Sequence, residues 1–183
     1  MAIIITGNPG VGKHTLAKSV TKILNYKILD INKIALESGL YEKKDNTIDV
    51  DVKKLKNILK KKIKRNSLIV GHLAPYVVSK TQVKKVIILR KNPYKLISVF
   101  KKRKYSAKKI IENTGSEVLG VIAYDSINRF GKKNSHQIDT TSKSVSKISK
   151  IVLSAIKGKF ENDTVDWLTL VSKKNELKKF FTY

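Results

Sequence analysis

A glycine-rich loop that carries a lysine is the stretch of this sequence best suited to chemistry. It runs from Gly7 to Thr15 and reads Gly-Asn-Pro-Gly-Val-Gly-Lys-His-Thr. Glycines let successive backbone N–H groups converge on phosphate oxygens, and a lysine in this register reaches the β- and γ-phosphates of a nucleotide. Gly10, Gly12 and Lys13 therefore predict a P-loop. The alternative is a glycine-rich turn without a nucleotide, in which Lys13 would have no structural task.

The residue after the lysine departs from the usual pattern of such loops. A Ser or Thr normally stands there, because its hydroxyl binds the Mg²⁺ that bridges the phosphates. This sequence has His14 instead. Thr15 is the next hydroxyl, but one position around a helix turns its side chain by about 100°, which makes it a weak metal ligand. His14 has two interpretations: a phosphate or metal contact, or a first-turn helix residue that faces solvent.

The elements that would position this loop flank it directly. An apolar run at residues 2–6 precedes it, and apolar residues at helical spacing follow it at Leu16, Val20, Ile23 and Leu24. Strand, loop and helix in this order place the phosphate site at a helix N-terminus.

Further apolar runs alternate with amphipathic helical patterns along the chain. The predicted strands after the first are at residues 26–29, 67–70, 86–89 and 136–139. This alternation predicts an α/β fold, a five-stranded parallel sheet with helices on both faces. Ligands bind beyond the carboxyl ends of such strands. The rule would bring Asp30, His72, Arg90 and Asp139 to the same edge of the sheet as the loop.

The predicted helices have recognisable ends. One at residues 31–38 stops at Gly39, one at 52–65 has a lysine-covered outer face, and one begins at Asn92-Pro93. A single long helix is predicted from Ser106 to Gly131, and another after Thr141. The tail, residues 159–183, carries an apolar stripe that we expect to dock on the body of one domain spanning residues 1–183.

Composition narrows the class of protein. The 183 residues include no cysteine, which excludes disulfides and thiolate metal sites, and three histidines argue against a structural zinc. The N-terminal apolar run is only a strand long, so we expect neither a signal peptide nor a membrane anchor. The sequence therefore predicts an intracellular, cytoplasmic protein.

The formal net charge of +25 is concentrated in the middle of the chain. No acidic residue occurs from Val52 to Ile111, whereas residues 30–51 hold six of the fourteen acids. A polyanionic partner, most often a nucleic acid, would explain the basic block. The alternative is a solvated lysine surface without a partner.

The order and spacing of these fragments resemble the adenylate kinase superfamily, and most of all its adenylate-kinase-six-type branch, which is tied to assembly of the small ribosomal subunit. Beside the P-loop, the similar fragments are residues 40–55, 69–73, 88–90, 103–106, 112–113, 138–141 and 165–167. The resemblance covers nearly the whole chain. It implies a P-loop kinase fold, ATP and Mg²⁺, an AMP or other nucleoside monophosphate acceptor, and a small-subunit ribosomal protein as partner.

The resemblance also implies which residues bind and act on ATP. The candidate ATP contacts are Gly10, Gly12, Lys13, His14, Thr15, Arg103, Asp139 and Thr140. Residues 101–111 match the lid, where Arg103 would press on the transferring phosphoryl group. Lys13, His72 and Arg103 are the candidate catalytic residues. His72 matches the histidine of the family's Asp-x-His element, but the Asp of that element is Val70 here.

Residues 30–53 match the segment that holds the acceptor monophosphate. The candidate acceptor contacts are Asp30, Asn32, Asp49, Asp51 and, from a strand end, Arg90. Because His14 and Val70 both remove oxygen atoms that serve Mg²⁺, they affect rate more than nucleotide binding. Thr15 is the one metal candidate left.

Three hypotheses follow. The first is a nucleoside monophosphate kinase and ATPase, ATP plus AMP giving two ADP, with modest activity and a role in small-subunit biogenesis. The second is an assembly factor with impaired catalysis that binds nucleotide and rRNA or a ribosomal protein. The third is a kinase for a small alcohol such as a nucleoside or shikimate, which would not need the acid-rich segment.

Overall fold

The structure is a computed structural model that describes residues 1–44 and 47–181, without the side chains of residues 41–49. The strands are β1 (Ala2–Thr6), β2 (Lys27–Asp30), β3 (Tyr41–Lys44), β4 (Thr47–Val50), β5 (Ser67–Val70), β6 (Val83–Arg90) and β7 (Ser135–Asp139). The α-helices are α1 (Lys13–Leu24), α2 (Ile31–Glu37), α3 (Val52–Lys62), α4 (Ala74–Val77), α5 (Pro93–Lys102), α6 (Ala107–Leu119), α7 (Val121–Phe130), α8 (Val145–Ile156) and α9 (Trp167–Lys173). Single 3₁₀ turns lie at Lys80–Gln82, Lys132–Asn134 and Leu177–Lys179.

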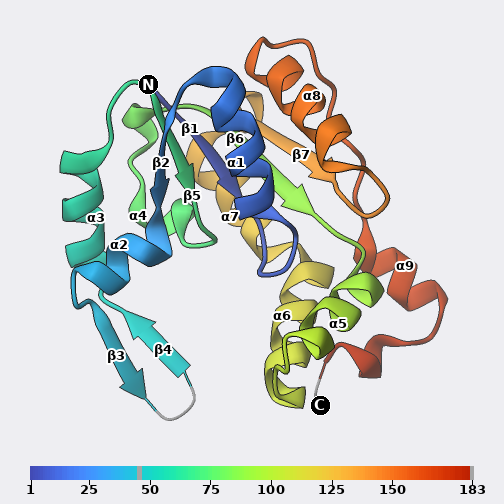
Figure 1. Cartoon of the computed structure of the whole chain (residues 1–183). Helices are drawn as coiled ribbons and strands as arrows, with labels where there is room; N and C mark the ends of the chain where they lie inside the picture. Colours follow the sequence, from blue (N-terminus) through green and yellow to red (C-terminus); the bar gives the residue numbers. More distant parts are fainter. Residues whose placement is uncertain (45–46, 182–183) are drawn as a thin grey trace.

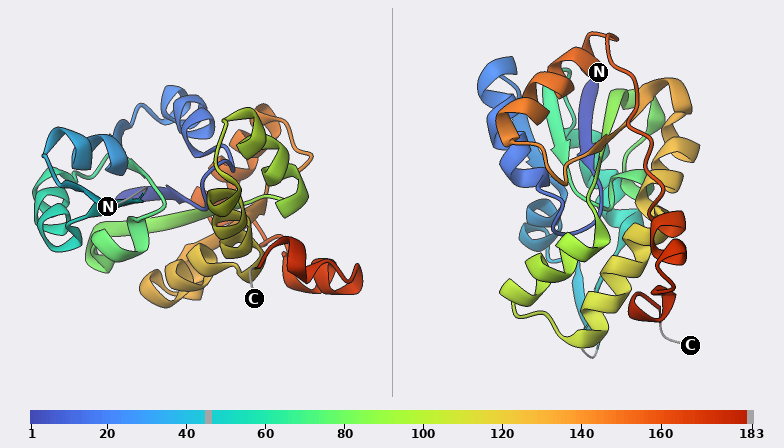
Figure 2. Two further views of the ribbon diagram at one scale, coloured as in Figure 1. Left: turned by 90° about the horizontal axis from the view of Figure 1, so that it is seen from below. Right: turned by 90° about the vertical axis from the view of Figure 1, so that its right-hand side faces the viewer.

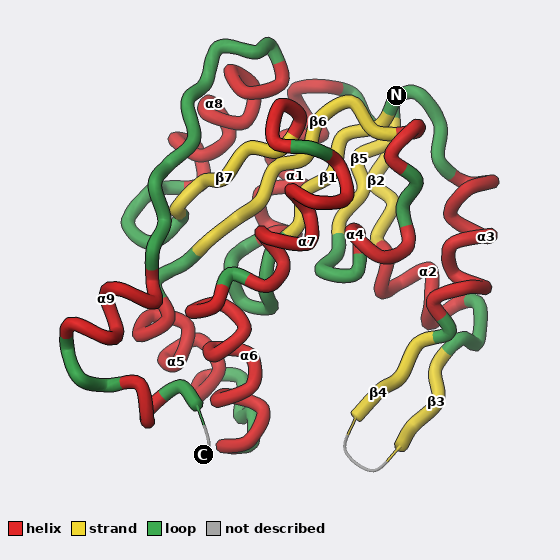
Figure 3. Tube along the Cα trace, turned by 180° about the vertical axis from the view of Figure 1, so that it is seen from behind, coloured by secondary structure: helices red, strands yellow, loops and turns green. Residues whose placement is uncertain are grey.

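A parallel sheet forms the centre of the fold. Its strand order is β2-β5-β1-β6-β7, and every pairing in it is parallel. Ile4 of the central strand β1 pairs with Ile69 on one side and Val86 on the other. The three central strands, β5, β1 and β6, are largely apolar and buried because both faces of the sheet are covered there (Figures 1 and 3). The five-stranded parallel sheet predicted from the sequence is confirmed.

Alternate residues of β1 enter two separate cores. Ile3 and Ile5 pack on one face with α1, α5 and α8, whereas Ile4 packs on the other with α2, α3, α4 and α7. All three isoleucines are fully buried. Figure 2 shows these helices as layers on either side of the sheet. Within the described part of the chain, no helix is long and apolar enough to span a membrane.

Two projections lie beyond the carboxyl ends of the strands. The antiparallel β3–β4 hairpin extends from one side of the sheet and the helices α5 and α6 from the other (Figures 1 and 3). The sequence did not predict the hairpin. The C-terminal segment runs beside α6, where Val171 and Phe180 pack against Val118 (Figure 2).

The long helix predicted from Ser106 to Gly131 is wrong, because the chain breaks at Gly120. This glycine adopts φ 67° and ψ 30°, a left-handed conformation that ends α6 and starts α7. Apolar periodicity continues through the break, so the pattern alone concealed it. Ile23 is also misplaced by the prediction: it is 59% exposed, on the outer side of α1.

We expect Gly120→Ala to destabilise the fold by more than the usual cost of a left-handed alanine, about 1–2 kcal/mol. An added Cβ would lie 3.3 Å from both terminal nitrogens of Arg90, whose guanidinium is itself held by Glu117 and Gln137. The free energy of unfolding from urea titrations measures the effect.

Gly39→Ala is the matched control for this substitution. Gly39 has nearly the same φ, 64°, but a Cβ there would meet no atom within 4 Å. Equal losses in the two variants would show that the contact with Arg90 has no energetic weight.

Candidate active site

The loop between β1 and α1 has the backbone conformation that a phosphate cradle needs. Gly7, Gly10 and Gly12 have φ of 132°, 85° and 99°, and α1 begins at the next residue, Lys13. At Gly7 a side chain is excluded outright, because a Cβ would lie 2.3 Å from the carbonyl oxygen of Leu89. The loop therefore packs directly on β6 and presents the first backbone N–H groups of α1.

Lys13 is held by the carbonyl groups of its own loop. Its ammonium donates hydrogen bonds to the carbonyl oxygens of Gly7 and Asn8, both at 2.8 Å, and the side chain is buried. Burial lowers the pKa of Lys13 to about 8, with the negative charge of Glu117 opposing this shift and the positive charge of Arg103 adding to it. An arriving phosphate would place a negative charge beside this ammonium and so raise its pKa.

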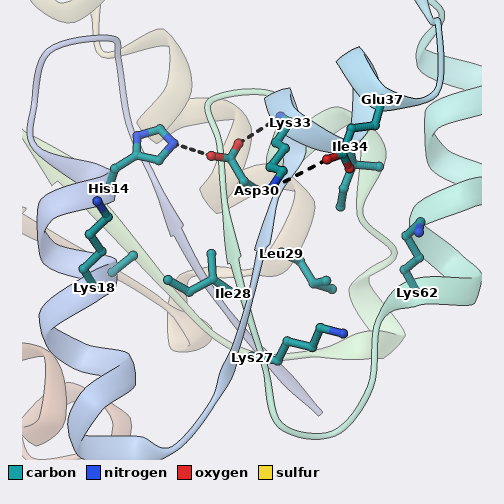
Figure 4. A pocket seen from close by; sticks show the side chains of 11 residues that line it. His14, Lys18, Lys27, Ile28, Leu29, Asp30, Lys33, Ile34, Glu37 and Lys62 are labelled. Atoms are coloured by element: carbon teal, nitrogen blue, oxygen red, sulfur yellow. Dashed lines mark hydrogen bonds and ion pairs between the residues drawn. The ribbon is translucent and has the colours of Figure 1, made fainter.

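His14 and Asp30 join α1 to the start of α2. The Nε2 atom of His14 lies 2.7 Å from Oδ2 of Asp30 (Figure 4). The other carboxylate oxygen of Asp30 caps α2 by accepting hydrogen bonds from the backbone N–H groups of Asn32 and Lys33. Both oxygens of Asp30 are therefore engaged, and His14 contacts a carboxylate rather than only solvent.

The residues at the usual magnesium positions do not fit that ion. His14 is turned to Asp30, Val70 is apolar and fully buried, and Thr15 is exposed one position further around α1. Among the described residues, no group of three His, Asp or Glu side chains could hold a metal. The hydroxyl directly after Lys13 and the carboxylate at the end of β5 are both replaced, and Thr15 is the hydroxyl that the first turn of α1 retains.

His72 lies where β5 ends, beside the P-loop. The strand and loop are linked here, because the Thr6 hydroxyl donates to the carbonyl oxygen of Gly71 at 2.9 Å. His72 is half-buried, and burial, followed by the positive charge of Lys13, lowers its pKa to about 4. The imidazole is therefore neutral at pH 7 and can accept or donate a hydrogen bond without adding charge.

Arg90 lies at the end of β6, as predicted, but its guanidinium is occupied. The residue as a whole is 4% exposed; Nε donates to Oε1 of Glu117 at 2.8 Å, and a terminal nitrogen donates to Oε1 of Gln137 at 2.9 Å. The structure thus places Arg90 behind the P-loop, in a buried ion pair. A monophosphate would have to displace Glu117 to reach this guanidinium.

Thr140 connects the end of β7 to the P-loop, and Asp139 precedes it in the strand. The hydroxyl of Thr140 is the donor in two contacts, to the carbonyl oxygen of Arg90 at 2.9 Å and to that of Val11 at 3.3 Å. Asp139 accepts a hydrogen bond from the backbone N–H of Thr141 and shapes the turn after β7. Thr140 therefore contacts the loop, whereas the bonds of Asp139 lie within the turn after β7.

Arg103 ends α5 and is exposed, close enough to Lys13 to lower the pKa of that lysine.

The candidate acceptor contacts of residues 30–53 lie on α2, β4 and the start of α3. Asp51 caps α3 and pairs with Lys54 at 3.3 Å, and Asn32 lies in the first turn of α2. Asp49 is in β4, opposite Glu42, and its side chain is outside the described part of the structure. The sequence-predicted residues thus gather at one end of the sheet, with Asp51 furthest along the acceptor segment.

Asn8 and Glu117 were missed by the sequence reasoning. Glu117 is fully buried, and Oε2 accepts a hydrogen bond from the Asn8 side chain at 2.7 Å. The available signal was a single acid within an apolar helical stripe, next to Val118. An acid at such a position is buried only when it is paired.

Comparison with known proteins gives the family. Residues 3–120 match a family model described as "AAA domain". The chain is 33% identical over 171 residues to "Putative adenylate kinase" of Saccharolobus solfataricus, covering 92% of this chain and 88% of that protein. It is 31% identical over 170 residues to the protein of the same name from Thermococcus kodakarensis, covering 91% and 93%. The chain belongs to the same family as these two relatives, within the P-loop nucleoside monophosphate kinase superfamily.

Solved structures share the fold at lower sequence identity. Shikimate kinase from Aquifex aeolicus has a TM-score of 0.55 at 16% identity, covering 86% of this chain and 97% of that one. Deoxyadenosine kinase from M. mycoides has a TM-score of 0.55 at 19% identity, covering 86% and 100%. These similarities confirm the P-loop kinase architecture.

His72 predicts a loss of stability in mild acid. Its folded pKa of about 4 lies below the ordinary value of 6.5, so the unfolded chain binds an extra proton between these pH values. The share of the unfolding free energy that comes from keeping His72 neutral is fully present above about pH 6.5, and it is lost as the pH falls towards 4. We expect the unfolding free energy of His72→Asn, from urea titrations at pH 6.5 to 4.5, to fall less steeply than that of the wild type. The same slope in both proteins would contradict this.

Proposed function

We propose that this chain is a nucleoside monophosphate kinase that transfers the γ-phosphoryl group of ATP to AMP and yields two ADP. The observation that carries the proposal is the convergence at one end of the sheet: Lys13 in the P-loop, the segment that begins at Asp30, and Arg103 after α5. Names of the archaeal relatives support the same reaction class.

The reaction needs positioning and charge stabilisation more than covalent chemistry. An oxygen of the acceptor phosphate would attack the γ-phosphorus, and the bond from that phosphorus to the β–γ bridging oxygen would break. The P-loop N–H groups and Lys13 would hold the donor phosphates, and Arg103 would neutralise charge on the group in transfer. Neutral His72 could orient a phosphate oxygen or water by a hydrogen bond.

Catalysis is proposed to be modest, with ATP hydrolysis as the accompanying activity. Mg²⁺ normally neutralises charge on the phosphates as the γ-phosphoryl leaves. Because the hydroxyl that binds Mg²⁺ is missing at His14 and the carboxylate that orients its waters is missing at Val70, this chain would depend more on Lys13 and Arg103. A kinase for a small alcohol is less well supported, since an acid-capped segment at Asp30 and Asp51 is not required for such an acceptor.

Lys13→Ala should lower turnover of ATP plus AMP by about 10²–10³, the usual cost of removing one group that stabilises transition-state charge. A coupled assay for ADP, repeated across a Mg²⁺ titration, measures this. Lys22→Ala is the matched control, since Lys22 lies in the last turn of the same helix and is exposed. Wild-type turnover no higher than that of Lys13→Ala at any Mg²⁺ concentration would refute the kinase proposal.

A second function, RNA binding in assembly of the small ribosomal subunit, is favoured by the outer face of α3. Six lysines on this helix are exposed: Lys53, Lys54, Lys56, Lys60, Lys61 and Lys62. Of these, only Lys54 has an ion pair with a carboxylate in the part of the chain that the structure describes. Unpaired lysines on one face suit the phosphates of a nucleic acid backbone.

A concave surface continues this basic face towards α1. It has a volume of about 470 Å³, and Lys18, Lys27 and Lys62 reach it from α1, β2 and α3 (Figure 4). Ile28, which is 37% exposed, forms part of its floor. A nucleotide could place its phosphate among these lysines and its base over the apolar floor. The ribosomal-protein partner implied by the resemblance stays a prediction without an assigned surface.

A single-stranded RNA oligonucleotide should bind in 50 mM salt and dissociate as salt rises, because counterion release dominates such binding. We expect the double variant Lys56→Glu/Lys60→Glu to lower the slope of log affinity against log salt by about 1.4, or about 0.7 for each lost phosphate contact. Fluorescence anisotropy measures both.

The control is Lys147→Glu/Lys150→Glu on α8, at the opposite edge of the sheet, which changes net charge by the same amount (Figure 1). Equal effects of the two double variants would indicate general attraction rather than a site on α3. Absence of binding at low salt would remove the RNA proposal altogether.

A further inference from the structure

The carboxylate of Glu117, on α6, binds three other segments of the chain: the P-loop, the end of β6 and the start of α9. Its Oε1 accepts hydrogen bonds from Nε of Arg90 at 2.8 Å, the backbone N–H of Lys91 at 3.0 Å and Nε1 of Trp167 at 3.1 Å. Its Oε2 accepts from Nδ2 of Asn8 at 2.7 Å. With no exposed surface, this carboxylate depends on all four donors to replace its water.

Asn8 carries this network into the P-loop. Its side-chain amide is held at both ends, since Nδ2 donates to Glu117 and Oδ1 accepts from the hydroxyl of Ser116 at 3.0 Å. The backbone carbonyl of the same residue accepts from Lys13 at 2.8 Å. One residue thus joins α6 to the lysine expected to meet the phosphates.

The other end of the network is the C-terminal segment. Trp167 begins α9, and further on Phe180 is fully buried against α6. The fit is close, because a Cβ at Gly115 would lie 2.7 Å from the carbonyl oxygen of Phe180. Since α6 also follows directly on residues 101–106, its C-terminal half is held by the tail while its N-terminal half adjoins Arg103.

We propose that Glu117 is a positioning residue which, through Asn8, sets the P-loop for ATP and couples the loop to the C-terminal segment at Trp167. This rests on the proposed nucleotide binding and adds a role for residues that do not touch the nucleotide. When phosphates draw Lys13 away from the Asn8 carbonyl, the hydrogen bond from Asn8 to Glu117 readjusts. Trp167 shares that carboxylate and senses the change.

Trp167 is the single tryptophan of the chain, so tryptophan emission comes from this residue alone. In the wild type, titration with ATP is expected to change Trp167 emission in step with binding measured by calorimetry. Asn8→Ala removes the link and the donor to Oε2 of Glu117, while the ion pair of Glu117 with Arg90 stays in place. We expect it to bind ATP about tenfold more weakly, the effect of one hydrogen bond to a charged group, and to lose the emission change.

Further variants separate positioning from stability. Trp167→Phe should weaken ATP binding by a few fold in calorimetry, and leave the KM for AMP unchanged. Tyr94→Phe is the matched control: it removes a hydrogen bond from α5 to Glu176 of the same tail and leaves Glu117 untouched. Its ATP affinity should stay within about twofold of the wild type. Glu117→Gln leaves the charge of Arg90 buried and uncompensated, and it therefore lowers stability as well. Urea midpoints are measured for every variant, so that a loss of stability is told apart from a loss of ATP affinity.

The outcomes distinguish failure of the coupling from failure of the proposed function. If the wild type binds ATP and acts as a kinase but Trp167 emission does not respond, the coupling is wrong and the proposed function stands. If Tyr94→Phe weakens ATP binding as much as Trp167→Phe, general loosening of the tail accounts for the effect and the coupling is again wrong. If calorimetry detects no ATP binding by the wild type, the proposed function fails and the coupling with it.

Discussion

The buried ion pair between Arg90 and Glu117 is the interaction on which the site depends. The two side chains are 5% and 0% exposed, and each belongs to a different element, β6 and α6. Removing one partner of such a pair costs about 3–5 kcal/mol, because the other charge stays buried. The P-loop, through Asn8, and the C-terminal segment, through Trp167, both bind the carboxylate of this pair. The active-site end of the sheet is therefore assembled around a charge pair rather than around apolar contacts alone.

The same pair changes what Arg90 can do. An arginine at a strand end, at the edge of the sheet where ligands bind, appears available for a phosphate when only the sequence is known. With Glu117 opposite it, the net charge of the pair is zero, and the cationic character of the site comes from Lys13 and Arg103. Lys13 is itself a weaker base than usual, since burial lowers its pKa to about 8. The site is thus less positive locally than the total charge of +25 implies.

The sequence was sufficient for the sheet and the P-loop, because these follow from local signals. Buried parallel strands are continuous apolar runs, and the glycines and lysine of the loop have fixed spacing. The break at Gly120 and the pairing of Asn8 with Glu117 were not predictable in this way. The break rests on one glycine whose left-handed conformation the apolar periodicity does not reveal. The pairing depends on α6 packing beside the loop, a contact between residues far apart in the chain. Helical periodicity reports which face is buried and cannot report what that face meets.

His14 and Asp30 show how a departure in sequence becomes a change in the site. A hydroxyl after Lys13 would face the phosphates, whereas the imidazole reaches across to the carboxylate that caps α2. This contact ties the phosphate loop to the start of the acceptor segment and uses both oxygens of Asp30. A carboxylate so engaged is a poor ligand for a cation that demands several oxygen atoms in octahedral geometry. The position after Lys13 therefore carries an intramolecular contact between α1 and the cap of α2 in place of a hydroxyl.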